Sequence, residues 1–324
     1  MEENTEPRVD LTLFSEKIQE LKDRIASVIV GQEQTVDLVL TAILANGHVL
    51  IEGVPGVAKT LLARLTARLI DADFSRVQFT PDLMPSDVLG TTVFNMKTNG
   101  FDFHQGPIFA DIVLVDEINR APAKTQAALF EVMEERQISI DGTTHRMGDL
   151  YTILATQNPV EQEGTYKLPE AQLDRFLMKI TMDYPSLEEE VNILERHHTN
   201  AALVKLDDIT PAITKEELLS LRAFMNQVFV DRTLLQYIAL IVQQTRTSKA
   251  VYLGASPRAS VAMLQSSKAY ALLQGRDFVT PEDIKFVAPY VLQHRLILTA
   301  EAEMEGYSPV KVTQRLIDKV EVPK

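Results

Sequence analysis

The sequence predicts an α/β protein: a three-layer αβα domain built on a parallel sheet, followed by a smaller all-α domain. Three observations support this prediction. Short apolar segments typical of buried strands alternate with helical segments up to about residue 185. One of these strands runs through a glycine-containing loop directly into a helix. Beyond residue 185 the strand pattern stops, and helix-capping signals take its place.

The first domain opens with a helix and then alternates strands with helices. The first helix is predicted over 11–28, where one face collects Leu11, Phe14, Ile18, Leu21 and Ile25. Strands are predicted at 48–53, 74–79, 111–116, 151–156 and 178–182, and further helices at 59–70 and 124–136. Buried strands separated by helices form a parallel sheet covered on both faces.

Two hairpins interrupt this alternation. Residues 91–106 place Asn99-Gly100 between strand-like flanks, and residues 137–147 place Asp141-Gly142 in the same way. Both dipeptides favour the positive φ angles of tight turns. We therefore expect two β-hairpin insertions that project from the sheet.

The second domain is predicted from its helix starts. Ser186 precedes Glu189 and Thr214 precedes Glu217, each in capping-box spacing, while Thr280-Pro281 and Ser308-Pro309 pair an N-cap hydroxyl with proline at the first helical position. The stretch 200–214 is the expected connection. We accordingly divide the chain into a nucleotide-binding core over 1–205, with both hairpins, and a helical lid over 206–324.

Composition limits the classes of partner. The 324 residues carry 32 Lys+Arg against 45 Asp+Glu, a net charge of −13, which opposes non-specific binding to a nucleic acid backbone. There is no cysteine, so disulfides and thiolate chemistry are excluded. No apolar run approaches the roughly 20 residues of a membrane span. The acidic start MEENTEPRVD does not have the order of a signal peptide, and we expect a cytoplasmic protein without membrane or nucleic acid partners.

The stretch GVPGVAKT at 53–60 has the form of a phosphate-binding loop between a strand and a helix. In such a loop Lys59 reaches the β and γ phosphates and the Thr60 hydroxyl ligates Mg²⁺. Ala58 replaces the usual last glycine: its methyl group is tolerated in helical backbone, whereas a positive φ is strained. Taken alone, the loop could also be an ordinary strand-to-helix turn.

Two further strands end in polar side chains. IVLVDE at 112–117 ends in Asp116, which could hold Mg²⁺, and Glu117, which could act as general base on the attacking water. The alternative is a solvent-facing acidic turn. Asn158 follows the strand at 151–156 and could orient the attacking water or touch the γ-phosphate, or simply begin a turn before Pro159.

These segments, in this order, resemble the AAA+ ATPases and specifically the MoxR family. The resemblance covers nearly the whole chain from Ile29 onwards. Its motifs are VIVGQE (28–33), GVPGVAKT, FTPDLMPSDVLG (79–90), GPIFADIVLVDEINRAPAKTQAALFEVMEER (106–136), LATQNPVEQEGTYKLPEAQLDRF (154–176) and GASPRA (254–259). The alanine in the loop is the form that this family is expected to use, while most AAA+ relatives keep glycine.

The resemblance implies a role for each motif residue. Asn158 matches sensor 1, Arg175 matches the arginine finger that a neighbouring subunit presents to the γ-phosphate, and Arg258 matches sensor 2 of the lid. Without the family, Arg175 would be a surface partner of Asp174 or Glu170. The expected nucleotide-binding residues are Val30, Gly31 and Gln32 at the adenine, and Gly53, Val54, Pro55, Gly56, Val57, Ala58, Lys59, Thr60 and Leu61 at the phosphates.

The implied function is Mg²⁺-dependent ATP hydrolysis in a ring, commonly a hexamer, that remodels or matures a protein partner or assists metal-cofactor insertion. Partners with von Willebrand factor A domains are expected from the family. A DNA-acting motor is one alternative, although the hairpins offer only Lys97 and Arg146 as cations. The other is a scaffold that binds nucleotide with little turnover. Arg120 could face a subunit interface or form a local salt bridge, and His197-His198 indicate a solvated helix end.

Overall fold

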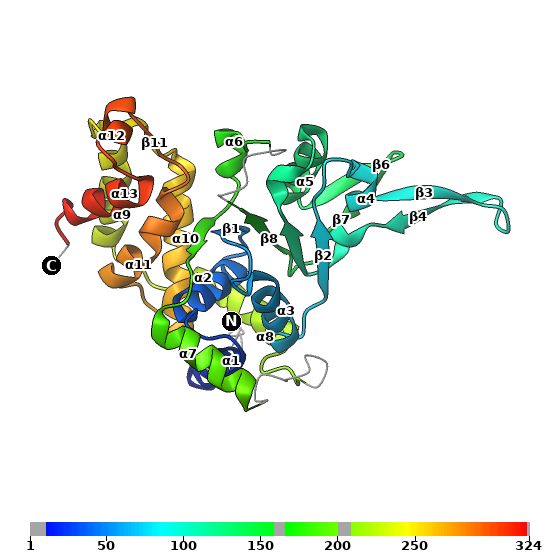
Figure 1. Cartoon of the computed structure of the whole chain (residues 1–324), viewed down its shortest axis with the longest axis horizontal. Helices are drawn as coiled ribbons and strands as arrows, with labels where there is room; N and C mark the ends of the chain where they lie inside the picture. The colour runs from blue at the N-terminus through cyan, green and yellow to red at the C-terminus, as the bar shows by residue number, and fades with distance from the viewer. Residues whose placement is uncertain (1–10, 159–165, 200–208, 323–324) are drawn as a thin grey trace, which may run out of the picture.

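The computed structural model describes residues 11–158, 166–199 and 209–322. Five parallel strands form the central sheet in the order β2-β5-β8-β1-β9 (Figure 1). Their bounds are β1 Val49–Gly53, β2 Phe74–Gln78, β5 Ile112–Asp116, β8 Thr152–Gln157 and β9 Met178–Met182. The predicted αβα fold class is confirmed, and each predicted strand is present to within two residues.

The strands bury alternate residues on the two faces of the sheet. Val49 and Ile51 belong to the core that includes α1 (Leu11–Val28), α2 (Glu33–Leu44) and α3 (Lys59–Leu69). Leu50, between them, joins the core on the other face, against α5 (Ala123–Glu135). Because successive strand residues point to opposite sides, a continuous apolar strand holds a helical layer on each face.

Both predicted hairpins are present. The longer, β3 (Gly90–Asn95) with β4 (Gly100–Gln105), extends well away from the body of the molecule (Figure 1). In the shorter, β6 (Gln137–Ile140) with β7 (Thr143–Arg146), the turn residues Asp141 and Gly142 have φ angles of 49° and 79°. Between these hairpins and the strands lie the short elements α4 (Pro85–Leu89), η1 (Pro107–Phe109) and η2 (Ile118–Arg120).

The second half is helical, as predicted, and three capping boxes begin its helices. Ser186 caps α7 (Leu187–His198), Thr214 caps α8 (Lys215–Phe224) and Thr280 caps α11 (Pro281–Leu292). The remaining elements are η4 Met225–Gln227, α9 Arg232–Thr247, α10 Pro257–Leu273, α12 Ala300–Met304 and α13 Pro309–Asp318, the last capped by Ser308. A two-stranded ribbon, β10 (Val251–Leu253) with β11 (Ile297–Leu298), is an addition that the sequence did not reveal, since it is too short to show a period.

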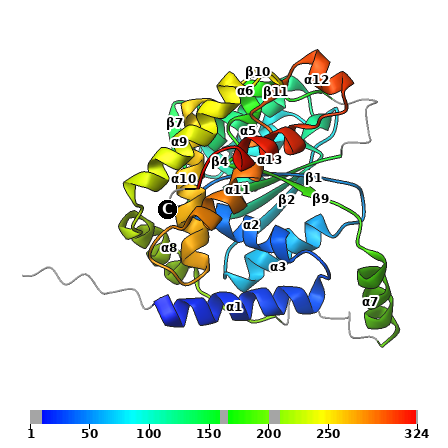
Figure 2. The ribbon, with the colours of Figure 1, turned by 90° about the vertical axis from the view of Figure 1, so that its left-hand side faces the viewer.

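The helical half packs directly on the core. Helix α10 contacts α2, and α11 lies along β9, the edge strand of the sheet. Figure 2 shows α7 at the border of the molecule, apart from the helices of the lid. The predicted domain boundary at residue 205 and most of the connection at 200–214 lie outside the described residues.

Candidate nucleotide-binding site

The loop between β1 and α3 has the backbone of a phosphate cradle. Gly56 has φ 88°, and within the described part of the chain no atom beyond its two chain neighbours lies within 4 Å of the place where a side chain would begin. Gly53 is needed for a different reason: a Cβ there would lie 2.7 Å from the carbonyl oxygen of Met182 in β9. The loop is thus exposed to solvent at Gly56 and packed tightly against β9 at Gly53, and α3 begins directly after it, as in loops that bind phosphate at a helix N-terminus.

Ala58, the N-cap of α3, has φ 61° and ψ 22°, so it is in the left-handed region. Of the two cases weighed from the sequence, the structure therefore shows the strained one. An L-residue pays about 1–2 kcal/mol for this conformation, and the surrounding loop must hold it there.

Lys59 opens α3 and folds back over the loop. Its Nζ donates to the carbonyl oxygen of Gly53 at 2.6 Å. Burial lowers the pKa of the Lys59 ammonium, while the carboxylates of Asp116 and Glu117 act in the opposite direction. The ammonium is thus partly removed from water and lies close enough to both acids to be influenced by their charge.

Asp116 ends β5, and its carboxylate has two partners. Oδ2 accepts from Arg76 Nε at 2.6 Å, and Oδ1 accepts from the Thr156 hydroxyl at 3.0 Å. Only 10% of the Asp116 side chain is exposed. The acidic turn is therefore not a solvent-facing one at this residue, because the carboxylate is held in a polar site at the end of the sheet.

Glu117 turns the chain away from β5 with φ 56°. Its N–H donates to the Thr156 hydroxyl at 3.0 Å, and its carboxylate accepts from Gln78 Nε2 at 2.7 Å. Arg120 Nε is 3.3 Å from the same carboxylate oxygen. Thr156 therefore joins both acids through one hydroxyl, which accepts from Glu117 and donates to Asp116.

Asn158 follows β8, the strand that lies between β5 and β1, and its side chain is buried. Strand order thus puts Asn158 between the paired acids and the phosphate loop. The sequence did not reveal Arg76, Gln78 or Thr156, because their roles depend on β2 and β8 being the two neighbours of β5.

A pocket of about 260 Å³ opens beside the loop. Its lining includes Val30 and Gln32 from the segment expected at the adenine. Gly31 has φ 73° and does not line the pocket; any side chain there would overlap the Glu189 carboxylate. The remaining lining residues are Val28, Ile29, Gly56, Val57, Ala58, Leu61, Pro185, Ile193 and His197.

The sequence indicates a solvated helix end at His197. It is exposed, and it also lines this pocket together with Ile193, one helical turn before it on α7. The i, i+4 spacing of Ile193 and His197 is the signal that could have indicated a shared face.

Arg175 and Arg258 lie beyond the N-terminal ends of the sheet strands, at the opposite side of the sheet from the phosphate loop. Parallel pairing aligns Val49 with Met178 and Gly53 with Met182, so Arg175, three residues before Met178, lies beyond the starts of the strands. The phosphate loop follows their ends. Four residue steps of strand, about 13 Å, separate the two edges.

Arg258 reaches the same edge from the lid. Its Nη2 is 2.8 Å from the Glu134 carboxylate near the end of α5. Two residues further on, Arg136 donates to the carbonyl oxygens of Asn46 and Tyr151, which precede β1 and β8. Arg175 also contacts α5, through the carbonyl oxygen of Phe130. Neither arginine is near the phosphate loop of its own chain.

No group of three or more His, Asp or Glu side chains that could hold a metal ion occurs within 11–158, 166–199 and 209–322. Among the helices of the described chain, none is both long and apolar enough to span a bilayer.

Comparison with known proteins places this site in a family. The model of the ATPase family associated with various cellular activities (AAA) matches residues 48–178, and that of the AAA lid domain matches 243–318. Chaperone MoxR1 of Mycobacterium tuberculosis is 44% identical over 309 residues, 93% of this chain and 81% of its own.

The chain belongs to the MoxR family of AAA ATPases.

Two further similarities extend over more than nine-tenths of the chain. The YeaC protein of Bacillus subtilis is 47% identical over 301 residues, which make up 93% of each chain. A crystal structure of a Cytophaga hutchinsonii protein proposed to be an ATPase superposes with a TM-score of 0.88 at 40% identity, covering 97% of both chains. The resemblance to the MoxR family inferred from the motifs is thereby confirmed, and with it the AAA fold and lid.

Proposed function

We propose that this MoxR-type chain is a Mg²⁺-dependent ATPase whose active sites form between neighbouring subunits of a ring. Each site would take its phosphate loop and acids from one subunit and its arginines from the next. The observation that carries this proposal is that Arg175 and Arg258 lie near the starts of the sheet strands, whereas Lys59 follows the end of β1. An arginine side chain is too short to reach round the sheet, so both would serve the phosphate of another copy.

Within one subunit, each loop residue has a separable task. Lys59 would exchange its bond to the Gly53 carbonyl for the β and γ phosphates, which attract the ammonium more strongly. Glu117 would accept a proton from the attacking water as general base. Asn158 would orient that water, and the 260 Å³ pocket with Val30 and Gln32 would take the base of the nucleotide.

The donor set fits a hard divalent cation. Thr60 supplies a hydroxyl next to Lys59, and Asp116 supplies a carboxylate held in place by Arg76 and Thr156. Few protein ligands are required, because Mg²⁺ at such sites keeps several waters and phosphate oxygens. When bound there, Mg²⁺ would neutralise charge on the phosphates. Asp116 would have to loosen its ion pair with Arg76 to become a ligand.

The purpose of hydrolysis would be the remodelling of a protein partner. A relative at 44% identity is named as a chaperone, which supports a chaperone-like role here. The β3–β4 hairpin exposes Val93, Phe94, Met96 and Phe101, an apolar surface that suits protein more than nucleic acid. We propose a hexamer, a partner with a von Willebrand factor A domain and a cytoplasmic location on the strength of the family resemblance.

The test is ATPase activity per subunit as a function of protein concentration, for the wild type, Glu117→Gln and Arg175→Ala. We expect activity per wild-type subunit to rise with concentration as rings assemble, and to fall by 10²-fold or more in both variants. Activity that is independent of concentration would contradict catalysis across subunits. Absence of turnover at every concentration, with nucleotide still bound, would support a nucleotide-binding scaffold instead.

A further inference from the structure

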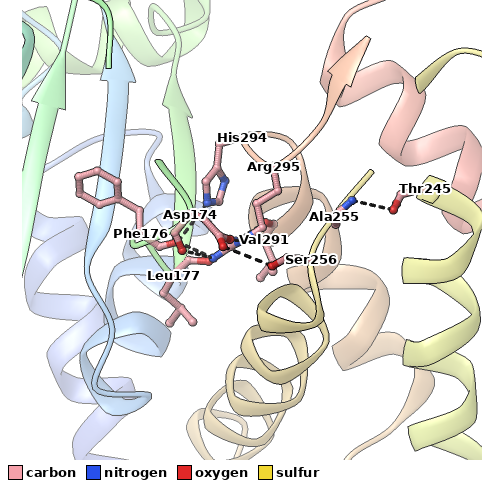
Figure 3. Close-up of polar contacts among 9 residues, drawn as sticks. All are labelled: Asp174, Phe176, Leu177, Thr245, Ala255, Ser256, Val291, His294 and Arg295. Atoms are coloured by element: carbon pink, nitrogen blue, oxygen red, sulfur yellow. Dashed lines mark hydrogen bonds and ion pairs between the residues drawn. The ribbon is translucent and has the colours of Figure 1, made fainter. Parts of the chain in front are cut away.

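Arg295 lies three residues beyond the end of α11, where the lid meets the segment that carries Arg175 (Figure 3). Only 4% of its side chain is exposed. Burial lowers the pKa of this guanidinium, and the ion pair with Asp174 opposes that shift. Removing a charged group from water is unfavourable unless hydrogen bonds or an opposite charge replace the lost hydration, so the partners of Arg295 must supply both.

All five N–H donors of Arg295 have acceptors. Nε donates to Asp174 Oδ1 at 2.6 Å, and Nη2 donates to the carbonyl oxygens of Asp174 at 3.1 Å and Phe176 at 2.7 Å. Nη1 donates to the carbonyl oxygens of Leu177, at 3.2 Å, and Val291. Three of these acceptors are main-chain carbonyls on either side of Arg175. The planar guanidinium of Arg295 therefore fixes the path of the main chain on both sides of Arg175, and with it the position from which the Arg175 side chain extends.

The same cluster reaches the second arginine. Asp174 Oδ2 accepts from the Ser256 hydroxyl at 3.3 Å, and Ser256 is the N-cap of α10, two residues before Arg258. His294 adds a bond from Nε2 to the Phe176 carbonyl oxygen at 3.0 Å. The Asp174 carboxylate thus connects the chain around Arg175 with the start of the helix that presents Arg258.

We propose that Arg295 is a positioning residue for the arginine pair Arg175 and Arg258. It never touches nucleotide; it holds the two arginines at a fixed separation, so that both can meet one phosphate group of the neighbouring subunit. This inference rests on the catalysis between subunits proposed above. Under this proposal, the residue that follows α11 in the lid of one subunit supports the active site of the next subunit without contacting it.

The first test compares Arg295→Met with Arg222→Met. Arg222 is a matched control: it is a partly buried arginine of α8 that donates to core carbonyls, those of Asp149 and Ile43, both at 2.6 Å, away from Arg175. We expect kcat to fall roughly 10²-fold in Arg295→Met, because misplacing a catalytic group by about 1 Å costs that much. KM and the Kd for a fluorescent ADP analogue should stay within about twofold, since the phosphate loop is untouched.

The second test mixes subunits. Arg295→Met keeps a working phosphate loop, and Glu117→Gln keeps working arginines, so a site between the two is complete. Random assembly at equal amounts places an active pair at about one interface in four. We expect the mixture to regain about that fraction of wild-type activity, although each variant alone is nearly inactive. If Arg295→Met does not fold, Asp174→Asn, which removes only the partner charge, replaces it in both tests.

The outcomes separate this inference from the proposed function. If Arg295→Met is as active as Arg222→Met while Arg175→Ala is inactive, the inference is overturned and the proposed function stands. If a mixture of Glu117→Gln with Arg175→Ala regains activity and the mixture with Arg295→Met does not, the inference is also overturned, since Arg295 then acts within its own subunit or only in folding. A wild type without turnover, or an active Arg175→Ala, would refute the proposed function itself.

Discussion

At the scale of the residue, one hydroxyl organises the two acids of the site. Thr156 accepts from the Glu117 N–H and donates to Asp116 Oδ1, and it is buried in the sheet. Since a hydroxyl can both give and take a hydrogen bond, no apolar side chain of the same shape can replace it. The orientation of both carboxylates therefore depends on an uncharged neighbour on another strand.

Thr156→Val keeps this shape and removes both bonds. We expect kcat to fall about tenfold, and more Mg²⁺ to be needed for half-maximal activity, because Asp116 loses one of its two partners. Thr152→Val is the control: Thr152 is buried on the same strand, and its hydroxyl has no hydrogen-bond partner among the described residues, so the change should be neutral or stabilising. Steady-state kinetics over a Mg²⁺ series measure both variants. Equal kinetics would show that Thr156 has only a packing role.

Ala58 offers a prediction about stability. Glycine enters the left-handed region without the steric strain of alanine, but it loses more backbone entropy on folding. The balance for Ala58→Gly is a gain of roughly 0.5–1 kcal/mol in the free energy of unfolding. Ala239→Gly, at an exposed position inside α9, should lose about 1 kcal/mol in the same denaturant titration. A loss in both variants would mean that Ala58 is not strained.

At the scale of the element, His48 joins two strands and a helix. Its Nδ1 accepts from the Ile153 N–H of β8 at 3.0 Å, so Nε2 carries the proton and donates to the Met133 carbonyl oxygen of α5 at 3.1 Å. Burial, followed by the charge of Arg136, lowers the pKa of His48 to about 3, and only the bond to Met133 opposes this. The ring must therefore stay neutral in the folded chain.

The sign of the pH effect follows from that shift. Below the ordinary value of 6.5 the unfolded chain binds a proton at His48 and the folded chain does not, until pH approaches 3. Stability is complete above pH 6.5 and falls as pH drops, by about 1.4 kcal/mol at pH 5.5. Urea midpoints at pH 7.5 and 5.5 should therefore differ less in His48→Gln than in the wild type. An unchanged difference would show that His48 is protonated in the folded state.

At the scale of the whole molecule, one apolar core extends from the sheet into the lid. It includes Val49 and Ile51 of β1, Met263 of α10 and Leu292 of α11 without interruption. Because elements that share a core support one another, we expect the two halves to unfold together. Hydrogen exchange of α10 and β1 amides near the denaturant midpoint, at concentrations too low for assembly, should give equal opening free energies. Separate transitions would show that the lid folds independently.

The sequence predicted the parts of the site that are contiguous along the chain. The loop at 53–60 and the acids at 116–117 are short motifs, and the strand–loop–helix order follows from apolar patterns and caps. It could not predict the pairing of Arg76 with Asp116, because that depends on strand order. Nor could it predict the contacts of Arg295, which join residues about 120 positions apart. Local propensity also could not decide the φ of Ala58, which the surrounding loop imposes.

Lys59 and Arg175 lie at opposite ends of the parallel strands, so under the proposed function each subunit has two unlike ends, one with the phosphate loop and one with the arginines that serve a neighbour. Copies that meet through such ends associate head to tail, and the series either closes or stays open. In a closed ring, every phosphate loop would face the arginines of a neighbouring subunit, so every site would be complete. An open series always has one fewer complete site than it has subunits, so turnover per subunit would reveal closure without any image of the assembly.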